Sequence, residues 1–295
     1  MIKTLDDAVE LLGGTEFMGD DAPPQVYEDP HRNDLFIIDH DDWALKAIAA
    51  ASFIQSLQFD NPESRFAYTM PRYDLTGLAV ARAIEHYAKD CVFFGEANFA
   101  ASEMQRSIPT YGGCEMRFYR TGSIHFLQAK VREWCTELKS PRRLIPMHLL
   151  DEPAVVASIA LMGDLFTTFH GGEPPAFYCA AMRGTTLQGL RIAWPRAAAH
   201  GYGVLGVKLR QHRVGKAKIF RSDLDYFVEA EPPPFPTSLR EDAKAYWYFL
   251  EHAEPGSVFI NTNNGEVRKP HVNLPPLQPD LKWDDETAFT RDLTE

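Results

Sequence analysis

Two neighbouring runs in residues 114–132 limit most strongly what this chain can fold into, because together they have the pattern of a β-hairpin. The first run, CEMRFY, alternates apolar and polar side chains, and RTGS supplies a turn to a second run, SIHFLQAKV. A hairpin makes its two strands antiparallel. The pattern therefore predicts an α+β protein in which long helices pack on a mixed or antiparallel sheet.

The rest of the chain predicts further elements of both kinds. Helical spacing of apolar residues, capping residues and closing glycines predict helices at residues 4–12, 41–58, 74–90, 152–170 and 238–253. Short apolar runs predict strands at residues 35–39, 65–70, 91–98, 176–182, 190–194 and 203–209. We expect an α+β core domain at 1–235, a C-terminal helix at 236–256, and an extended or disordered, proline-rich acidic arm at 257–295.

Composition excludes some classes of protein. The chain has 295 residues, of which 45% are hydrophobic, and this is enough to bury a substantial core. A net charge of −11 disfavours binding to an anionic membrane or sequence-independent binding to nucleic acid. The apolar run 154–169 contains Asp164 and is shorter than the ~20 residues of a membrane span, so it predicts a buried helix. Because the N-terminal sequence lacks a secretion signal and the four cysteines lack zinc-binding spacing, we expect a cytoplasmic protein without a metal.

Cys114 and Arg132 are the candidate chemical groups of the predicted hairpin. Alternation places Cys114 with Met116 and Phe118 on the apolar face of the first strand, whereas Arg132 ends a returning face that changes from apolar to polar. This pattern describes either the floor of a pocket with a cationic mouth or a strand that leaves the core. A nucleophilic cysteine reacts as the thiolate, which a nearby arginine would stabilise.

Several of these segments resemble the thymidylate synthase superfamily, which includes the deoxynucleotide hydroxymethylases. The segments that carry the resemblance lie within residues 65–185 and are FAYTMPRYD with the helix after it, VFFGEANFAASEMQRSIPTYGGC, FYRTGSIHFLQAKVR and DEPAVVASIALMGDLF. The resemblance implies a thymidylate-synthase-like core in which Cys114 attacks a pyrimidine ring. It also implies that the nucleotide and its phosphate are bound by Arg132, Arg72, Asn98 and Arg183.

The chain also departs from the pattern of that superfamily. YAKDC stands where paired arginines are expected before VFFGEAN, and CAAMRG stands where a His-x-Tyr pair would bind the sugar. These departures imply altered or lost catalysis. The resemblance therefore implies a divergent nucleotide-modifying transferase, or a relative that only binds a pyrimidine nucleotide or a nucleotide-containing polymer. The sequence assigns no cofactor, neither folate nor any other.

The segment KLRQHRVGKAKIFR, residues 208–221, concentrates positive charge within an acidic protein. Such a cluster is either a solvated surface or a site for an anionic partner, for instance nucleic acid or an acidic arm from a second copy of the chain. This segment supports an alternative hypothesis, a non-enzymatic assembly or interaction protein that forms a homo-oligomer. The basic side chains that would bind the partner are Lys208, Arg210, Arg213, Lys216, Lys218 and Arg221.

Three further motifs suggest other chemistry. GYGVLG at 201–206 fits the GxGxxG pattern of dinucleotide sites, but its neighbours do not predict a βαβ unit, so a glycine-rich loop is favoured. MRGTT at 182–186, together with VEAE at 228–231, is similar to motifs of ADP-ribosyltransferases, which are the second alternative. DHDD at 39–42 offers carboxylates to a divalent metal, but capping of the helix that follows is favoured.

Overall fold

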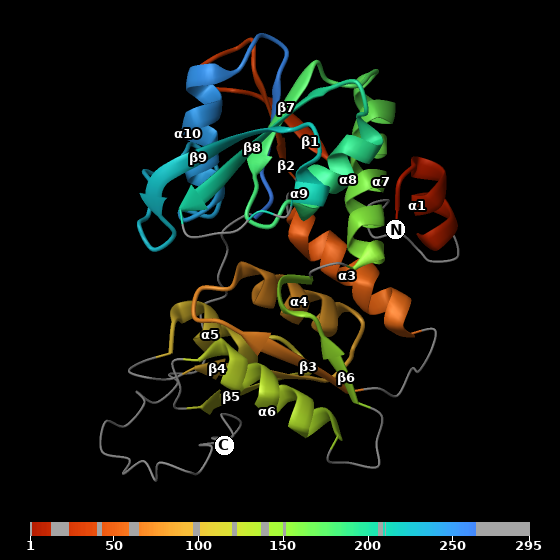
Figure 1. Cartoon of the computed structure of the whole chain (residues 1–295), viewed down its shortest axis with the longest axis vertical. Coiled ribbons are helices and arrows are strands. Elements are labelled where there is room, and N and C mark those ends of the chain that lie inside the picture. Colours follow the sequence, from red (N-terminus) through yellow and green to blue (C-terminus); the bar gives the residue numbers. More distant parts are fainter. Residues whose placement is uncertain are drawn as a thin grey trace. The chain divides into compact units, whose positions relative to one another are not determined.

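A computed structural model describes residues 2–12, 24–39, 43–58, 65–96, 101–119, 123–136, 142–149, 152–205, 209 and 211–263 (Figure 1). These residues divide into two compact units. Unit 1 comprises the described residues within Met1–Phe53 and Leu150–Glu266, and unit 2 comprises those within Ile54–Leu149. Each unit has its own sheet.

The sheet of unit 1 has six strands in the order β1-β2-β10-β7-β8-β9. β1 pairs with β2 in the antiparallel direction, and the other four pairings are parallel. The bounds of the strands are β1 Gln25–Glu28, β2 Phe36–Asp39, β7 Ala176–Ala180, β8 Ala198–Leu205, β9 Lys218–Asp225 and β10 Val258–Ile260.

Helices cover both faces of this sheet. In Figure 1, α10 (Asp242–His252, blue) lies on one side of the strands, whereas α7 (Pro153–His170) and α8 (Thr185–Ala193), both green, lie on the other. α7 and α8 approach closely because Gly189 has no side chain; a Cβ atom there would lie 2.6 Å from Cβ of Ile159. The remaining helices of this unit are α1 (Leu5–Leu12), α9 (Gln211–Val214) and the first part of α3 (Leu45–Gln58).

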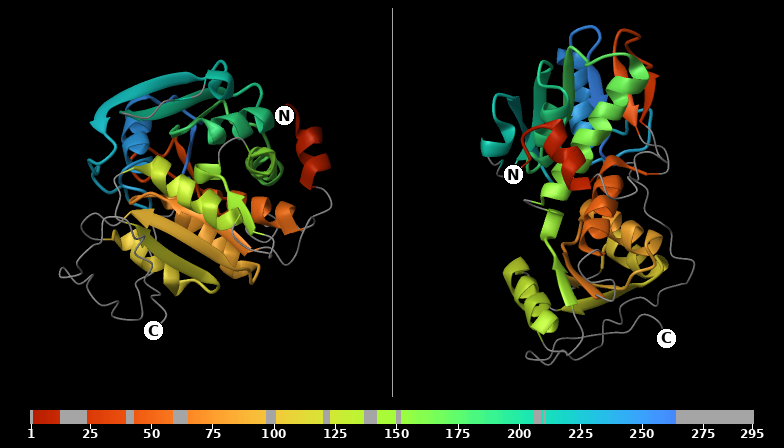
Figure 2. Two further views of the ribbon diagram at one scale, coloured as in Figure 1. Left: turned by 60° about the horizontal axis from the view of Figure 1, so that its bottom comes forward. Right: turned by 90° about the vertical axis from the view of Figure 1, so that its right-hand side faces the viewer.

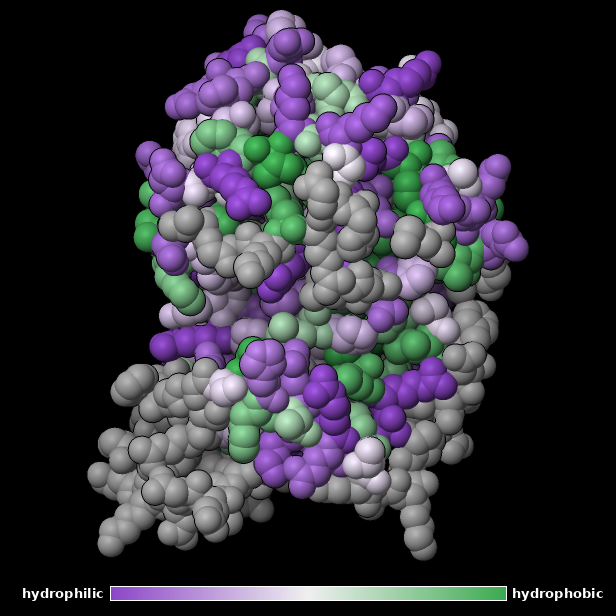
Figure 3. Space-filling model, viewed as in Figure 1, coloured by the Kyte–Doolittle hydropathy of each residue, from purple (hydrophilic) through white to green (hydrophobic). Residues whose placement is uncertain are grey.

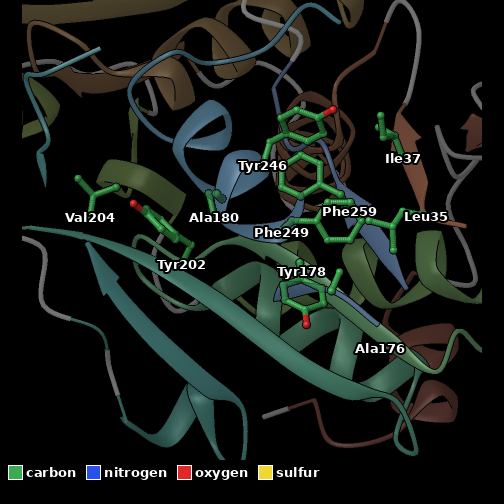
Figure 4. Packing of buried hydrophobic residues seen from close by; sticks show 12 residues of the cluster. Leu35, Ile37, Ala176, Tyr178, Ala180, Tyr202, Val204, Tyr246, Phe249 and Phe259 are labelled. Atoms are coloured by element: carbon green, nitrogen blue, oxygen red, sulfur yellow. The ribbon is translucent and has the colours of Figure 1, made fainter. Parts of the chain in front are cut away.

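An aromatic core joins α10 to the sheet. Tyr246 and Phe249 of α10 pack against Phe259 of β10 and Tyr178 of β7, with Leu35 beside them (Figure 4). The ring centroids of Tyr178 and Phe249 are 5.2 Å apart and those of Tyr246 and Phe259 are 5.6 Å apart, at angles typical of edge-to-face contacts. Burial of these rings fixes α10, and therefore the residues at its N-terminus, relative to the carboxyl ends of the strands.

α7 is the one helix in the described part of the chain that is long and apolar enough, by length and composition, to cross a membrane. More than half of it (56%) is buried within the protein, which is typical of a core helix. Trp194, the residue after α8, packs its ring against Phe166 of α7 and donates a hydrogen bond to the carbonyl of Gly163 at 3.0 Å. On the face drawn in Figure 3, hydrophilic and hydrophobic side chains are interspersed over the described surface.

The sheet of unit 2 has four strands in the order β5-β4-β3-β6, and all three pairings are parallel. In the right-hand view of Figure 2, α6 (yellow-green) lies on one side of these strands and α4 (light orange) on the other. The bounds are β3 Arg65–Met70, β4 Cys91–Glu96, β5 Cys114–Tyr119, β6 Arg142–Ile145, α4 Leu75–His86, α5 Glu103–Ser107, α6 Ile124–Thr136 and the 3₁₀ turns η1 Ile108–Thr110 and η2 Met147–Leu149.

The predicted fold class is wrong, since the chain is an α/β protein with predominantly parallel sheets. The predicted hairpin is the source of the error: β5 pairs in parallel with β4, and SIHFLQAKV lies in a helix, α6. SIHFLQAKV fits the pattern of a strand and also that of a helix. Leu127, Val131 and, just after this run, Trp134 are spaced to form one face of a helix, and this face is buried. The predicted strand at 190–194 is wrong for the same reason, as Leu187 and Leu190 form the buried face of α8.

The other strong patterns of the sequence are confirmed. The helices predicted at 4–12, 41–58, 74–90, 152–170 and 238–253 correspond to α1, α3, α4, α7 and α10. Asp74 caps α4 as expected, and Gly171 ends α7 with a φ of 79°. Within the predicted arm, Val258–Ile260 form β10 between β2 and β7, whereas residues 264–295 lie outside the described part of the chain.

Candidate functional site

The order of the strands in unit 1 indicates where a site can form. Along the chain, β7 is followed outward by β8 and β9, and the chain then returns to place β10 on the other side of β7. The direction of winding thus reverses between β7 and β10, with α8 on one face and α10 on the other. In sheets of this kind, ligands bind beyond the carboxyl ends of the strands at the point of reversal. The described residues that directly follow β10 and β7 lie at this edge.

Lys46 is held at this edge in the first turn of α3, seven residues after β2 ends. Its backbone N–H donates to the carbonyl oxygen of Thr262, which follows β10, at 3.2 Å. Its ammonium group lies 2.7 Å from Oε2 of Glu241, and the side chains of Lys46 and Glu241 are 23% and 8% exposed. A lysine amine is therefore fixed beside a carboxylate in a partly buried place.

Asp242, at the start of α10, is fully buried and anchors the segment after β10. Its two carboxylate oxygens accept from the hydroxyl of Thr262 at 2.9 Å each, and Nδ2 of Asn263 donates to Oδ2 at 3.0 Å. Burial raises the pKa of Asp242 from 3.8 to about 6, although the positive charge of Lys46 acts in the opposite direction. Thr262 and Asn263 therefore supply hydrogen bonds to both oxygens of the Asp242 carboxylate.

The charge of Lys46 also acts on the thiol of Cys179 in β7, the strand on the other side of β10. Burial raises the pKa of the Cys179 thiol, the negative charge of Asp242 adds to this, and Lys46 opposes it. Lys46, Asp242 and Cys179 are therefore close enough to interact electrostatically. This places the amine of Lys46 next to the reversal between β7 and β10.

The connection from β7 to α8 supplies groups that suit an anion. Gly184 precedes the helix with a φ of 84°, and α8 begins at Thr185 without a side-chain cap. Arg213 is only 1% exposed, and its Nη1 donates to Oγ1 of Thr185 at 3.1 Å. Backbone N–H groups at the start of a helix, joined by a buried guanidinium, form a favourable environment for a phosphate or carboxylate.

Unit 2 contains a second polar cluster, formed by Tyr68, Asp74 and His148. The Tyr68 hydroxyl donates to Oδ2 of Asp74 at 2.5 Å, and Nδ1 of His148 lies 3.3 Å from Oδ1. Burial alone raises the pKa of Asp74, but the charge of His148 and hydrogen bonds from His148, Tyr68 and Thr76 outweigh it, so the pKa is lowered. His148 and Leu149 have φ values of 60° and 50°, which are strained for residues other than glycine.

The structure does not bring the predicted nucleophile and phosphate ligand together. Cys114 is buried on the face of the sheet that packs against α4, and its thiol donates to the carbonyl of Ala81 at 3.7 Å. Arg132 is exposed on α6, whose neighbouring Val131 packs on the opposite face, against Val92 and Phe94. The nucleotide site that these two residues were expected to form is therefore not present in the described part of unit 2.

The other predicted phosphate ligands are dispersed. Arg72 follows β3 and is half-buried, with its Nε buried and lacking a hydrogen-bond partner among the described groups. Arg183 is half-buried in the β7–α8 connection, directly before Gly184, so it is the predicted phosphate ligand that lies at the candidate edge of unit 1. Asn98 lies outside the described residues.

The basic segment 208–221 is not one charged surface, because its described part includes both α9 and the start of β9. Arg213 points inward to Thr185. Lys216, Lys218 and Arg221 are exposed in the turn after α9 and on the edge strand β9, whereas Lys208 and Arg210 lie outside the described residues. Lys218 and Arg221 are an odd number of residues apart and therefore belong to opposite faces of a regular strand. Binding of an anionic partner by these side chains stays a prediction.

The residues of the candidate site in unit 1 were largely missed by the sequence analysis. Lys46, Glu241 and Thr262 come from three distant parts of the chain, and no single motif includes all three. The sequence indicates a role for Lys46 only through its position, in the first turn of a helix that follows a buried strand. That position becomes informative only when the strand is known to lie beside the reversal of the sheet.

Comparison with known proteins finds similar structures but no match by sequence. No protein-family model matches the chain, and no protein of curated function matches it. Among solved structures, an ACC deaminase homologue has a TM-score of 0.66 at 14% identity and covers 87% of this chain and 94% of its own. A pyridoxal 5′-phosphate-dependent aspartate racemase has a TM-score of 0.65 at 11% identity, with 90% and 95% covered. A lysine-to-alanine mutant of O-ureido-L-serine synthase, with O-ureido-L-serine bound, has a TM-score of 0.60 at 12% identity, with 83% and 88% covered.

These likenesses overturn the resemblance to thymidylate synthase and the thymidylate-synthase-like core that it implied. The hypothesis of a pyrimidine-nucleotide-binding protein or transferase is wrong with it, and the alternatives of an assembly protein and an ADP-ribosyltransferase are not supported either. The described parts of the segments that suggested the resemblance form helices and strands of units whose sheets are predominantly parallel. At these identities, what this chain shares with the three solved structures is the fold.

Proposed function

We propose that this chain is an enzyme that binds pyridoxal 5′-phosphate at the carboxyl edge of the unit 1 sheet, with Lys46 as the point of attachment, and that its substrate is an amino acid. The observation that carries the proposal is the amine of Lys46, held beside the reversal of the sheet at 2.7 Å from Glu241. Support comes from solved structures with the same fold: one is described as pyridoxal 5′-phosphate-dependent, and another is a lysine-to-alanine mutant with O-ureido-L-serine bound.

The residues at this edge fit the chemical groups of the cofactor. Its aldehyde requires a lysine amine, and its phosphate requires a set of N–H donors. Lys46 supplies the amine, and Glu241 supplies a carboxylate beside it. The start of α8, with Thr185 and Arg213, supplies the donors for the phosphate, and Gly184 lets the backbone turn there.

When bound, the cofactor would supply an electron sink for bonds broken next to the amino group of the substrate. The chain's own residues have supporting roles. Asp242 fixes Thr262 and Asn263, and Thr262 in turn accepts a hydrogen bond from the backbone of Lys46, so the amine is held in place. Burial of Arg213 keeps its guanidinium against Thr185, where it adds positive charge to the helix N-terminus.

The proposal is tested by cofactor titration of the full-length protein. We expect added pyridoxal 5′-phosphate to give an absorbance band at longer wavelength than the free compound. Borohydride should then make the link permanent, and peptide mapping should locate it at Lys46. Lys46→Ala should abolish both signals, whereas Lys218→Ala, which removes an exposed lysine from β9, should retain them. Labelling spread over surface lysines, or retained in Lys46→Ala, would refute the assignment.

The reaction class is tested separately with the loaded protein. A panel of L- and D-amino acids is incubated in D₂O, and the Cα–H signal of each is followed by NMR. Loss of the signal with at least one amino acid, dependent on Lys46, is expected of an enzyme that breaks bonds at this carbon. Exchange of none of them, by a protein that does carry the cofactor on Lys46, would refute catalysis at Cα while leaving the binding site intact.

A further inference from the structure

The ion pair between Lys46 and Glu241 is held from both sides, unlike a mobile surface pair. The backbone of Lys46 is tied to Thr262, and Glu241 directly precedes α10, whose first residue Asp242 is anchored by Thr262 and Asn263. The hydroxyl of Tyr226 lies 3.5 Å from Oε1, the second oxygen of Glu241. The positions of α3 and of the start of α10 therefore determine the geometry of the ion pair, including its 2.7 Å distance.

This contact has a chemical consequence for the amine. A lysine reacts with a carbonyl group only as the neutral amine, because the ammonium form has no electron pair to donate. An opposite charge within hydrogen-bond distance favours the charged form. Among the described residues, the titratable groups shown to interact with Lys46 include the carboxylates of Glu241 and Asp242 and the thiol of Cys179 in β7. The surroundings therefore stabilise the unreactive ammonium.

The two carboxylates are not equivalent as proton acceptors. Both oxygens of Asp242 already accept hydrogen bonds from Thr262, and Asn263 donates to one of them. Oε2 of Glu241 is the oxygen that faces the ammonium directly. The Glu241 side chain, at 8% exposure, retains limited access to water, whereas Asp242 is fully buried. Glu241 is the carboxylate placed to exchange a proton with Lys46.

We propose that Glu241 controls the charge state of Lys46, holding the amine as ammonium before attachment and accepting its proton when the cofactor attaches. In this step an N–H bond of the Lys46 ammonium breaks, an O–H bond forms on Oε2, and the electron pair of the broken bond stays on Nζ. Attachment of the neutral amine to the aldehyde would then release the aldehyde oxygen with the two remaining amine hydrogens as one water molecule. Glu241 is thus a positioning residue that acts through Lys46. This inference rests on the proposed attachment of pyridoxal 5′-phosphate to Lys46.

The test compares the pH dependence of attachment in four full-length proteins. Pyridoxal 5′-phosphate at a fixed concentration is added to the wild type, Glu241→Gln, Glu241→Asp and Glu251→Gln, and the absorbance of the attached cofactor is recorded against pH. Glu251 is a matched control, because it lies on α10, the helix that Glu241 precedes, and its side chain is 77% exposed. We expect the midpoint in Glu241→Gln to move to lower pH by about one unit or more. Glu241→Asp should move back towards the wild type, and Glu251→Gln should not shift.

A second readout needs no cofactor. Competitive acetylation with acetic anhydride at increasing pH, followed by peptide mapping, gives the pH at which Lys46 becomes reactive in each protein. We expect the same downward shift in Glu241→Gln. An unchanged Lys46 profile in that variant would overturn the inference even if the cofactor attaches to Lys46. If the wild type attaches no cofactor at any pH, the proposed function fails, and the role of Glu241 in attachment fails with it.

Discussion

Asp242 offers a quantitative test of the electrostatics at the candidate site through the variant Asp242→Asn. The carboxyl group is buried, and its pKa in the folded protein is raised from 3.8 to about 6. Between these two pH values the folded state binds more protons than the unfolded state. The contribution of Asp242 to the free energy of unfolding is therefore greatest below about pH 4 and decreases as the pH rises towards 6. Asparagine has nearly the same shape but cannot ionise, so the variant lacks this dependence.

The magnitude follows from the two pKa values. Each pH unit between them corresponds to about 1.4 kcal/mol, so the ionised Asp242 costs the native state about 3 kcal/mol above pH 6. About 2 kcal/mol of this develops between pH 4 and pH 7. We therefore expect the stability of Asp242→Asn, relative to the wild type, to increase by about 2 kcal/mol from pH 4 to pH 7. Hydrogen bonds to Thr262 and Asn263 that the amide makes less well lower the stability at both pH values and cancel in this difference.

The assay is urea denaturation at pH 4, 5, 6 and 7, followed by tryptophan fluorescence, to which Trp194 and Trp247 of unit 1 contribute. Groups that titrate in both proteins and do not interact with Asp242 contribute equally to both curves and cancel in the difference. Parallel curves, in which the variant and the wild type differ equally at all four pH values, would refute the reasoning. They would mean that Asp242 has the same proton affinity in the folded and unfolded states.

Two further variants test unit 2. Asp74→Asn should show the opposite sign, because the lowered pKa of Asp74 contributes stability that is present above pH 3.8 and is lost as the pH falls. In the same urea assay, the free energy of unfolding of the variant should be about 2 kcal/mol below that of the wild type at pH 7, and this difference should shrink in acid. A difference that grows in acid would contradict this. Gly113→Ala should lower the free energy of unfolding by about 2 kcal/mol or more, because Gly113 has a φ of 75° and a Cβ atom there would lie 1.9 Å from the carbonyl oxygen of Lys89. A melting temperature equal to that of the wild type would show that this turn relaxes freely.

Local chemistry explains which parts of the fold were predictable from the sequence. α4 begins at Asp74 because the carboxylate accepts from the N–H of Thr76, and α7 ends at Gly171 because glycine adopts a positive φ without strain. Such signals involve residues a few positions apart, so they are visible in the sequence. The helical spacing of α3 and α10 is of the same kind.

The direction of the strands is not a local property. CEMRFY has the same alternation whether its neighbour is parallel or antiparallel. Its parallel pairing joins Cys114 to Cys91, which lies 23 positions earlier in the chain. The run after it satisfies both a strand period and a helix period. The ambiguity is resolved by burial of Leu127, Val131 and Trp134 against the sheet, a contact that forms only in the folded unit.

The candidate site has the same dependence on strand order. Lys46 and Glu241 are 195 residues apart, and they meet because β2 and β10 are parallel neighbours at the reversal of the unit 1 sheet. The unit 2 sheet obeys the same rule: the chain runs through β3, β4 and β5 and then returns to β6 on the other side of β3. Asp74 follows β3 and His148 follows β6, so the second polar cluster also lies at a reversal. In both units the polar groups follow strands that become neighbours only through the topology. A search for local motifs therefore led to Cys114 and Arg132, whereas the order of the strands leads to Lys46 and Glu241.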